Sequence, residues 1–89
     1  MSEKKAYFTI LEKDEPVFWY GHIDGNEILS DILSMLNKRS VNRVIIEEDD
    51  IATIGFKDSD NKKLILVAKK DGIFLLFQLL KKTIENSHH

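Results

Sequence analysis

The sequence predicts a single α+β domain, in which two strands precede a helix and three further strands precede a second helix. Several short segments alternate apolar and polar residues or are apolar throughout, and both patterns are typical of strands. Two longer segments instead carry apolar residues at helical spacing. With 89 residues, 43% of them hydrophobic, the chain has room for one core and too much apolar content for a disordered segment.

The first two strands are expected at residues 6–11 and 17–20, joined by a charged turn. In the first strand Phe8 and Ile10 fall on one face, and the residues between and beside them fall on the other. The second strand is short and aromatic. Pro16 at its start has no backbone N–H to give to a neighbour, which favours an edge position in the sheet.

A first helix is expected to begin near Asp24, because Glu27 follows three residues later as in a capping box, and to end near Lys38. Its apolar positions are Ile28, Leu29, Ile32, Leu33, Met35 and Leu36. They cover an arc of roughly 160°, which is wide for a helix that packs on one sheet. Ile28, Ile32 and Met35 are expected along one border of this arc, and Leu29 and Leu33 lie towards the other. One border is therefore expected to face the sheet, and the other is available to a partner.

Three further strands are expected at residues 41–47, 51–56 and 64–68. The acidic run at residues 47–50 marks a hairpin tip between the first two of them, and the polar residues 57–62 form the next loop. The segment 64–68 is apolar at every position, so both of its faces should be buried. It should lie in the middle of the sheet.

The segment from Ile73 to Ile84 can be read as a strand or as a helix. The preceding pair Asp71-Gly72 taken alone favours a hairpin turn into a strand. However, Leu, Gln and Lys dominate the segment, and no β-branched residue lies between Ile73 and Thr83. Its main apolar residues fall at helical spacing: Ile73, Leu76, Phe77, Leu80 and Ile84. We therefore predict a second helix that follows a turn at Asp71-Gly72.

Some apolar residues exceed what one small core needs. Phe74 lies on the flank of the second helix, and Leu75 and Leu79 lie on a different face from its core stripe. These residues either contact a partner or become core if the fold closes around them. The same two interpretations apply to Trp19 and Tyr20, which are either interface anchors or aromatic core residues.

Composition excludes several classes of function. The formal charge is −2, with 13 basic and 15 acidic residues interleaved, so no broad positive field for nucleic acid or anionic lipid is expected. The chain has no cysteine, and thus no disulfide or thiolate metal site. No apolar stretch approaches the roughly 20 residues that span a bilayer. We expect a cytoplasmic protein that does not insert into membranes, and we interpret His88 and His89 as remnants of a purification tag.

No catalytic, metal or cofactor constellation is recognisable. His22 could act as a general base, but no nucleophile pattern accompanies it, and an ordinary loop residue is the simpler interpretation. The acidic run at 47–50 is better explained as a solvated hairpin tip than as a cation site. Residues 58–61 resemble the opening of a calcium loop, but Lys63 and Lys69 stand where Gly and Glu are required. We expect no cofactor, no metal and no enzymatic activity.

The two arginines, Arg39 and Arg43, flank the junction between the first helix and the third strand. A guanidinium there could meet the carboxylate or phosphate of a partner. For Arg39, compensation of the negative end of the helix is the simpler interpretation.

The element order, with residues 64–68 as a central fifth strand and residues 24–27 opening the first helix, resembles that of the longin and roadblock families. The resemblance covers residues 7–86. It implies a five-stranded antiparallel sheet of order 2-1-5-4-3, with one helix after the second strand and one after the fifth. The chain departs from roadblock proteins by lacking an N-terminal helix, and from longins by having one C-terminal helix in place of two.

We therefore expect a non-enzymatic protein–protein interaction module, either a homodimer or a subunit of a complex; the resemblance suggests a small GTPase or a trafficking assembly as partner. The alternatives are a small-molecule or ion sensor with a pocket between sheet and helix, and a small enzyme that uses His22. From the resemblance, the contact is expected on the first helix and third strand, at Ile28, Ile32, Met35 and Val44. The competing surface is the last helix, at Phe74, Leu75 and Leu79.

Overall fold

The computed structural model describes residues 7–21 and 27–86. Its strands are β1 (Tyr7–Glu12), β2 (Glu15–Tyr20), β3 (Arg43–Glu48), β4 (Ile51–Lys57) and β5 (Lys63–Lys69). Its helices are α1 (Glu27–Leu36) and α2 (Lys70–Asn86). The strands form one antiparallel sheet in the order β2-β1-β5-β4-β3. The predicted α+β fold, element order and strand order are confirmed.

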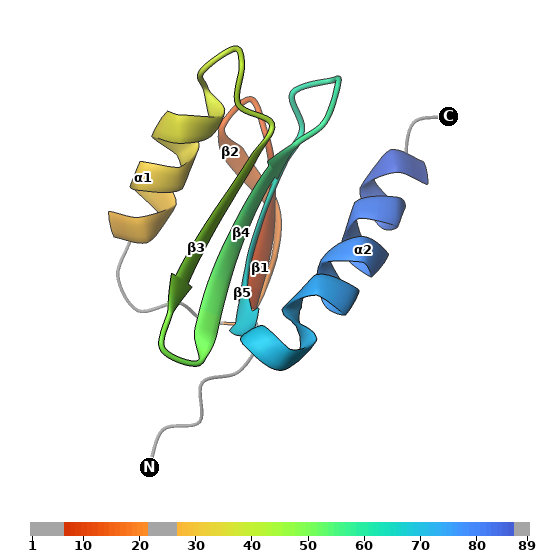
Figure 1. Ribbon diagram of the computed structural model, residues 1–89. Coiled ribbons are helices and arrows are strands. Elements are labelled where there is room, and N and C mark those ends of the chain that lie inside the picture. The colour runs from red at the N-terminus through yellow and green to blue at the C-terminus, as the bar shows by residue number, and fades with distance from the viewer. Residues whose placement is uncertain (1–6, 22–26, 87–89) are drawn as a thin grey trace.

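The two helices cover opposite faces of the sheet (Figure 1). The cluster under α1 contains Leu11, Ile32, Leu36 and Ile65. The cluster under α2 contains Ala52, Ile54, Phe56, Leu64, Leu66, Ile73, Phe77 and Ile84. Strand β5 contributes to both, because successive side chains of a strand point to opposite faces. Its predicted position in the middle of the sheet is confirmed, between β1 and β4.

Helix α1 approaches β4 closely at Gly55. A methyl group added at that glycine would lie 2.4 Å from Cγ2 of Ile32 and 3.2 Å from Cδ1 of Leu36. Both side chains are fully buried. A glycine inside a strand often marks a close approach of this kind. The predicted capping residue Asp24 lies outside the described residues.

Helix α2 follows β5 directly, with Lys70 as its first residue. The helix itself is confirmed, but the predicted turn at Asp71-Gly72 is wrong, because both residues belong to the first helical turn. An aspartate at this position is favourable, since the N-terminal end of a helix carries partial positive charge. The hairpin signal of Asp-Gly is thus overridden by the helical spacing of the residues that follow.

Short connections join β1 to β2, β3 to β4 and β4 to β5. Lys13 and Asp14 both have positive φ, 54° and 63°, between the paired residues Glu12 and Glu15. This geometry belongs to a two-residue hairpin turn, whose twist matches that of the strands. In the β4–β5 loop, Oδ1 of Asp58 accepts hydrogen bonds from the backbone N–H groups of Asp60 and Lys62, both at 2.9 Å.

Candidate interaction surfaces

Strand β3 forms one edge of the sheet, and within the described ranges no strand pairs with its outer side. Val44 and Ile46 pack partly buried against the cluster under α1. Arg43 points to the opposite face, where its guanidinium carbon lies 5.2 Å from the ring centre of Phe77 in α2. By alternation Ile45 and Glu47 share that face with Arg43. The predicted contact residue Val44 therefore lies at this edge, beneath α1.

The predicted contact residues of α1 differ in whether the structure leaves them accessible to a partner. Ile32 has no exposed surface and packs against the sheet, so the expectation that it contacts a partner is wrong. Met35 is 38% exposed and remains available. The side chain of Ile28 lies outside the described part of the chain. The helix is thus rotated so that Ile32 and Leu36 form the centre of its buried stripe rather than its border.

Strand β2 forms the other edge, as Pro16 predicted, and all of its residues are exposed. Val17, Phe18, Trp19 and Tyr20 each expose more than half of their surface, with Trp19 at 65%. The structure therefore places Trp19 and Tyr20 on the surface rather than in the core. The pairing with β1 shifts register between Ile10 and Leu11, which leaves Val17 without an opposite residue.

The two faces of β2 have different neighbours. On the α2 face, the rings of Phe18 and Tyr20 stack on Phe8 of β1, with centroid distances of 5.6 and 5.8 Å. Helix α2 lies over β5 and β4. Phe18 and Tyr20 are each more than half exposed, whereas Phe8 and Ile10 are half-buried and pack against the cluster under α2. We call the surface formed by Phe8, Ile10, Phe18 and Tyr20 the aromatic half-face.

The outer side of α2 carries the competing predicted residues. Phe74, Leu75 and Leu79 expose 48%, 68% and 57% of their surface. They do not close into the core of this chain. Their exposure agrees with the expectation of surplus apolar surface.

An apolar cavity of about 400 Å³ lies between α1 and the β1–β2 side of the sheet. Its lining residues are Tyr7, Thr9, Leu11, Asp14, Pro16, Trp19, Gly21, Leu29, Leu33 and Ile65. The hydroxyl of Thr9 already donates a 2.9 Å hydrogen bond to the carbonyl oxygen of Phe18. Burial raises the pKa of Tyr7, which keeps its phenol neutral. The cavity therefore has space for an apolar group and would give it few polar contacts.

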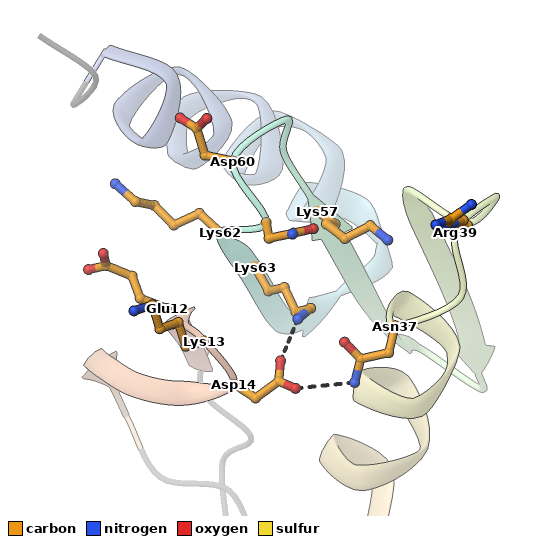
Figure 2. A pocket seen from close by; sticks show the side chains of 10 residues that line it. Glu12, Lys13, Asp14, Asn37, Arg39, Lys57, Asp60, Lys62 and Lys63 are labelled. Carbon is orange, nitrogen blue, oxygen red and sulfur yellow. Dashed lines mark hydrogen bonds and ion pairs between the residues drawn. The ribbon is translucent and has the colours of Figure 1, made fainter.

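A second, polar cleft of about 780 Å³ opens at the end of the sheet where the β1–β2 and β4–β5 hairpins meet α1 (Figure 2). At its floor the buried ammonium of Lys63, in a residue only 4% exposed, forms an ion pair with Asp14. The side-chain amide of Asn37 donates a 3.2 Å hydrogen bond to the other oxygen of Asp14. The bond from Lys63, and then that from Asn37, hold the pKa of Asp14 below its usual range.

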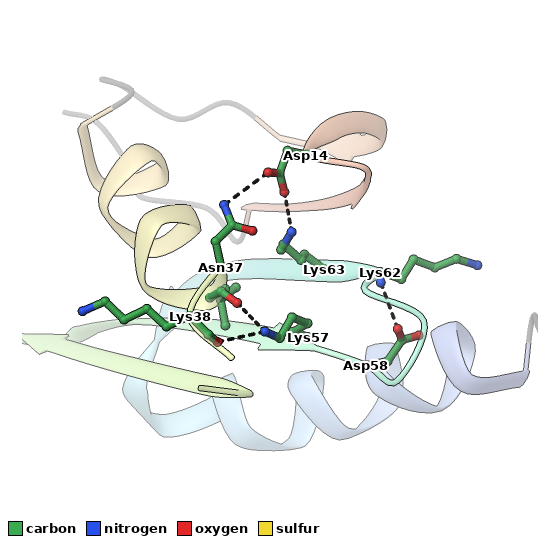
Figure 3. Close-up of polar contacts among 8 residues, drawn as sticks. Asp14, Asn37, Lys38, Lys57, Asp58, Lys62 and Lys63 are labelled. Carbon is green, nitrogen blue, oxygen red and sulfur yellow. Dashed lines mark hydrogen bonds and ion pairs between the residues drawn. The ribbon is translucent and has the colours of Figure 1, made fainter. Parts of the chain in front are cut away.

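Lys57 of β4 also lines this cleft (Figure 3). Its ammonium donates hydrogen bonds to the carbonyl oxygens of Leu36, at 2.6 Å, and Lys38, at 3.1 Å. The last carbonyls of a helix have no intrahelical partner, and a cation there is favourable. Lys57 therefore supplies the positive charge at the C-terminal end of α1, a role that the sequence suggested for Arg39. The lysines at the floor of the cleft hold α1 and the two hairpins together.

The described part of the chain contains no cluster of three or more acidic or histidine side chains able to hold a metal ion. His22, the one histidine considered for catalysis, lies outside the described residues. Neither described helix is long and apolar enough to cross a membrane.

Comparison with known proteins identifies no relative: no protein-family model, no curated protein and no solved structure matches the chain. The likeness to longin and roadblock proteins, and the partners it suggests, therefore stay predictions.

Proposed function

We propose that the chain is a non-enzymatic protein–protein interaction module that forms a homodimer by pairing β3 with β3 of a second copy. The resemblance to longin and roadblock proteins suggests that such a dimer serves as a scaffold or regulator for a small GTPase. The observation that carries the proposal is the self-complementary pattern of the β3 edge, Arg43-Val44-Ile45-Ile46-Glu47.

In an antiparallel pair with its two-fold axis at Ile45, that residue lies opposite its own copy. Val44 then lies opposite Ile46 of the second copy, and Arg43 lies opposite Glu47 of the second copy. Residues directly opposite each other share a face, and the positions of Arg43 and Glu47 on the α2 face satisfy this requirement. An apolar centre is thus flanked on both sides by a pair of opposite charges.

The side chains involved are available for these contacts. Arg43, Ile45 and Glu47 are exposed, and no ion pair joins Arg43 or Glu47 to another described residue. An uncovered strand edge carrying isoleucine favours pairing with another chain. Met35 adds apolar surface, because it lies about 200° around α1 from Leu33, which lines the cavity on the β1–β2 side. It therefore faces the β3 edge.

The proposal is tested by charge reversal. Arg43→Glu places two glutamates opposite each other in each half of the dimer, and Glu47→Arg places two arginines opposite each other. We expect either variant to weaken the dimer by about tenfold or more, because like charges on opposite strand positions are destabilising. Sedimentation equilibrium over a concentration series measures the dimer dissociation constant.

A mixture of the two variants supplies the matched control. In the mixed dimer every glutamate at position 43 or 47 of one chain faces an arginine of the other, so an equimolar mixture should recover dimers that neither variant forms alone. The mixture also separates this effect from the loss of the contact between Arg43 and Phe77, which the Arg43→Glu chain carries in both settings. Dimers that survive in both single variants would refute the pairing of β3.

A further inference from the structure

The apolar cavity between α1 and β2 results from the width of the sheet. Five strands spaced about 4.8 Å apart span about 19 Å, whereas a helix with its side chains is about 10 Å wide. Helix α1 lies chiefly over β4 and β3, so no described helix covers the β1–β2 side of this face (Figure 1). The cavity occupies that side and measures about 400 Å³.

The walls of the cavity are apolar, and one of them is an exposed aromatic ring. Leu29 and Leu33 line it from α1, and both are half-buried. Trp19, the only tryptophan of the chain, lines it from β2 and exposes 65% of its surface. Aromatic rings favour offset-stacked or edge-to-face contacts with one another. A flat ring placed in the cavity could therefore contact Trp19 on one side and the leucines of α1 on the other.

The floor of the cavity presents one buried hydrogen-bond donor. Tyr7 and Thr9 both line it, at 8% and 2% exposure. The hydroxyl of Thr9 already donates to the carbonyl oxygen of Phe18, whereas the hydroxyl of Tyr7 donates to no described residue. Burial raises the pKa of Tyr7, so its phenol keeps the proton at neutral pH. Buried phenols usually have a hydrogen-bond partner, and an acceptor atom of a ligand would supply one.

The charge of the lining disfavours an ionic ligand. Among the described residues that line the cavity, Asp14 is the only one with a charged side chain. Its carboxylate would repel an anion. Its two oxygens already accept hydrogen bonds from Lys63 and Asn37, so a cation would have to compete with the ammonium of Lys63. A neutral ligand meets neither obstacle.

We propose that the cavity binds one small neutral aromatic molecule, whose ring contacts Trp19 and whose carbonyl oxygen accepts a hydrogen bond from Tyr7. An apolar cavity of about 150 Å³ holds benzene, so a cavity of about 400 Å³ has space for two fused rings. The inference goes beyond the proposed function. The cavity lies on the β1–β2 side, whereas β3 is the opposite edge of the sheet, so a dimer through β3 leaves it accessible.

The probes are tetralone and tetralin, which share one bicyclic skeleton and differ in a single carbonyl group. Because the chain has one tryptophan, its indole N–H gives a single signal in a proton–nitrogen correlation NMR spectrum, and that signal reports on the cavity wall. We expect both probes to shift it along a saturable curve below about 1 mM. Tyr7→Phe should weaken tetralone by about threefold or more and leave tetralin unchanged, because it removes only the hydroxyl.

A matched pair of variants of α1 locates the site. Leu33→Phe enlarges a side chain that lines the cavity and should weaken both probes by about tenfold or more. Ser34→Phe adds the same ring at the next residue, which is exposed and does not line the cavity, and should leave binding unchanged. Circular dichroism checks that both variants are folded.

Three outcomes would overturn the proposal: no shift of the indole signal with either probe up to about 1 mM, an equal effect of Tyr7→Phe on both probes, or loss of binding in Ser34→Phe but not in Leu33→Phe. The titration is repeated with the Arg43→Glu variant. Probe binding that persists there, whatever the oligomeric state, separates the cavity from the β3 edge, so either proposal can fail without the other.

Discussion

At the scale of single residues, the buried cation of Lys63 depends on Asp14. Asp14→Asn would leave this ammonium with a neutral partner in a site that is only 4% exposed. Removing one partner of a buried polar contact costs about 1–3 kcal/mol, and the exposure of Asp14, at 44%, favours the lower part of that range. Urea unfolding at pH 7 measures the loss in the free energy of unfolding. Asn37→Ala is the matched control and should cost less, since it removes one neutral donor.

The ion pair between Asp14 and Lys63 also predicts that the free energy of unfolding depends on pH. The pKa of Asp14 is lower in the folded chain than in the unfolded chain, chiefly because Lys63 donates to it. The stabilisation is therefore present above the unfolded pKa, about 4, and is lost as pH falls through the folded value. The difference in unfolding free energy between the wild type and Asp14→Asn should shrink as the pH is lowered from 5 toward about 2. A difference that stays constant over this range would contradict the assignment.

At the scale of elements, the position of α1 depends on the missing side chain of Gly55. Gly55→Ala would place a methyl group 2.4 Å from Cγ2 of Ile32, a branched side chain with no exposed surface into which it could move. Overpacking of this kind typically costs about 1–3 kcal/mol. We expect a lower denaturant midpoint with an unchanged m-value. Gly72→Ala is the control, because nothing lies within 4 Å of the added methyl and alanine favours a helix. It should be neutral or stabilising.

The elements could be predicted from the sequence, but their rotation and junctions could not. Alternation placed Phe8 and Ile10 together on one face of β1, which the structure shows to be the α2 face, and the uniformly apolar β5 identified the central strand. The wide apolar arc of α1 left several rotations open, and Ile32 was assigned to the border although it lies at the centre. The ion pair between Asp14 and Lys63 joins residues 49 positions apart, a contact that local periodicity does not encode.

At the scale of the whole molecule, core and surface positions should respond differently to an introduced carboxylate. Ile32→Asp should unfold the chain, since an unpaired carboxylate would replace a fully buried side chain under α1. Leu75→Asp should stay folded within about 0.5 kcal/mol of the wild type, because Leu75 is 68% exposed. Circular dichroism and sedimentation distinguish the two variants. A folded Leu75→Asp that is monomeric would move the dimer contact from β3 to α2.

The central position of β5 also has a consequence for how the chain is made. β5 is the last of the five strands in the sequence, yet it joins β1 to β4. While the ribosome is still adding its residues, the β1–β2 and β3–β4 hairpins are separate two-stranded ribbons, each marginally stable alone. The sheet can close only after β5 has left the exit tunnel, so from the completion of β4 until then the nascent chain carries two open inner edges, which are templates for pairing with other chains.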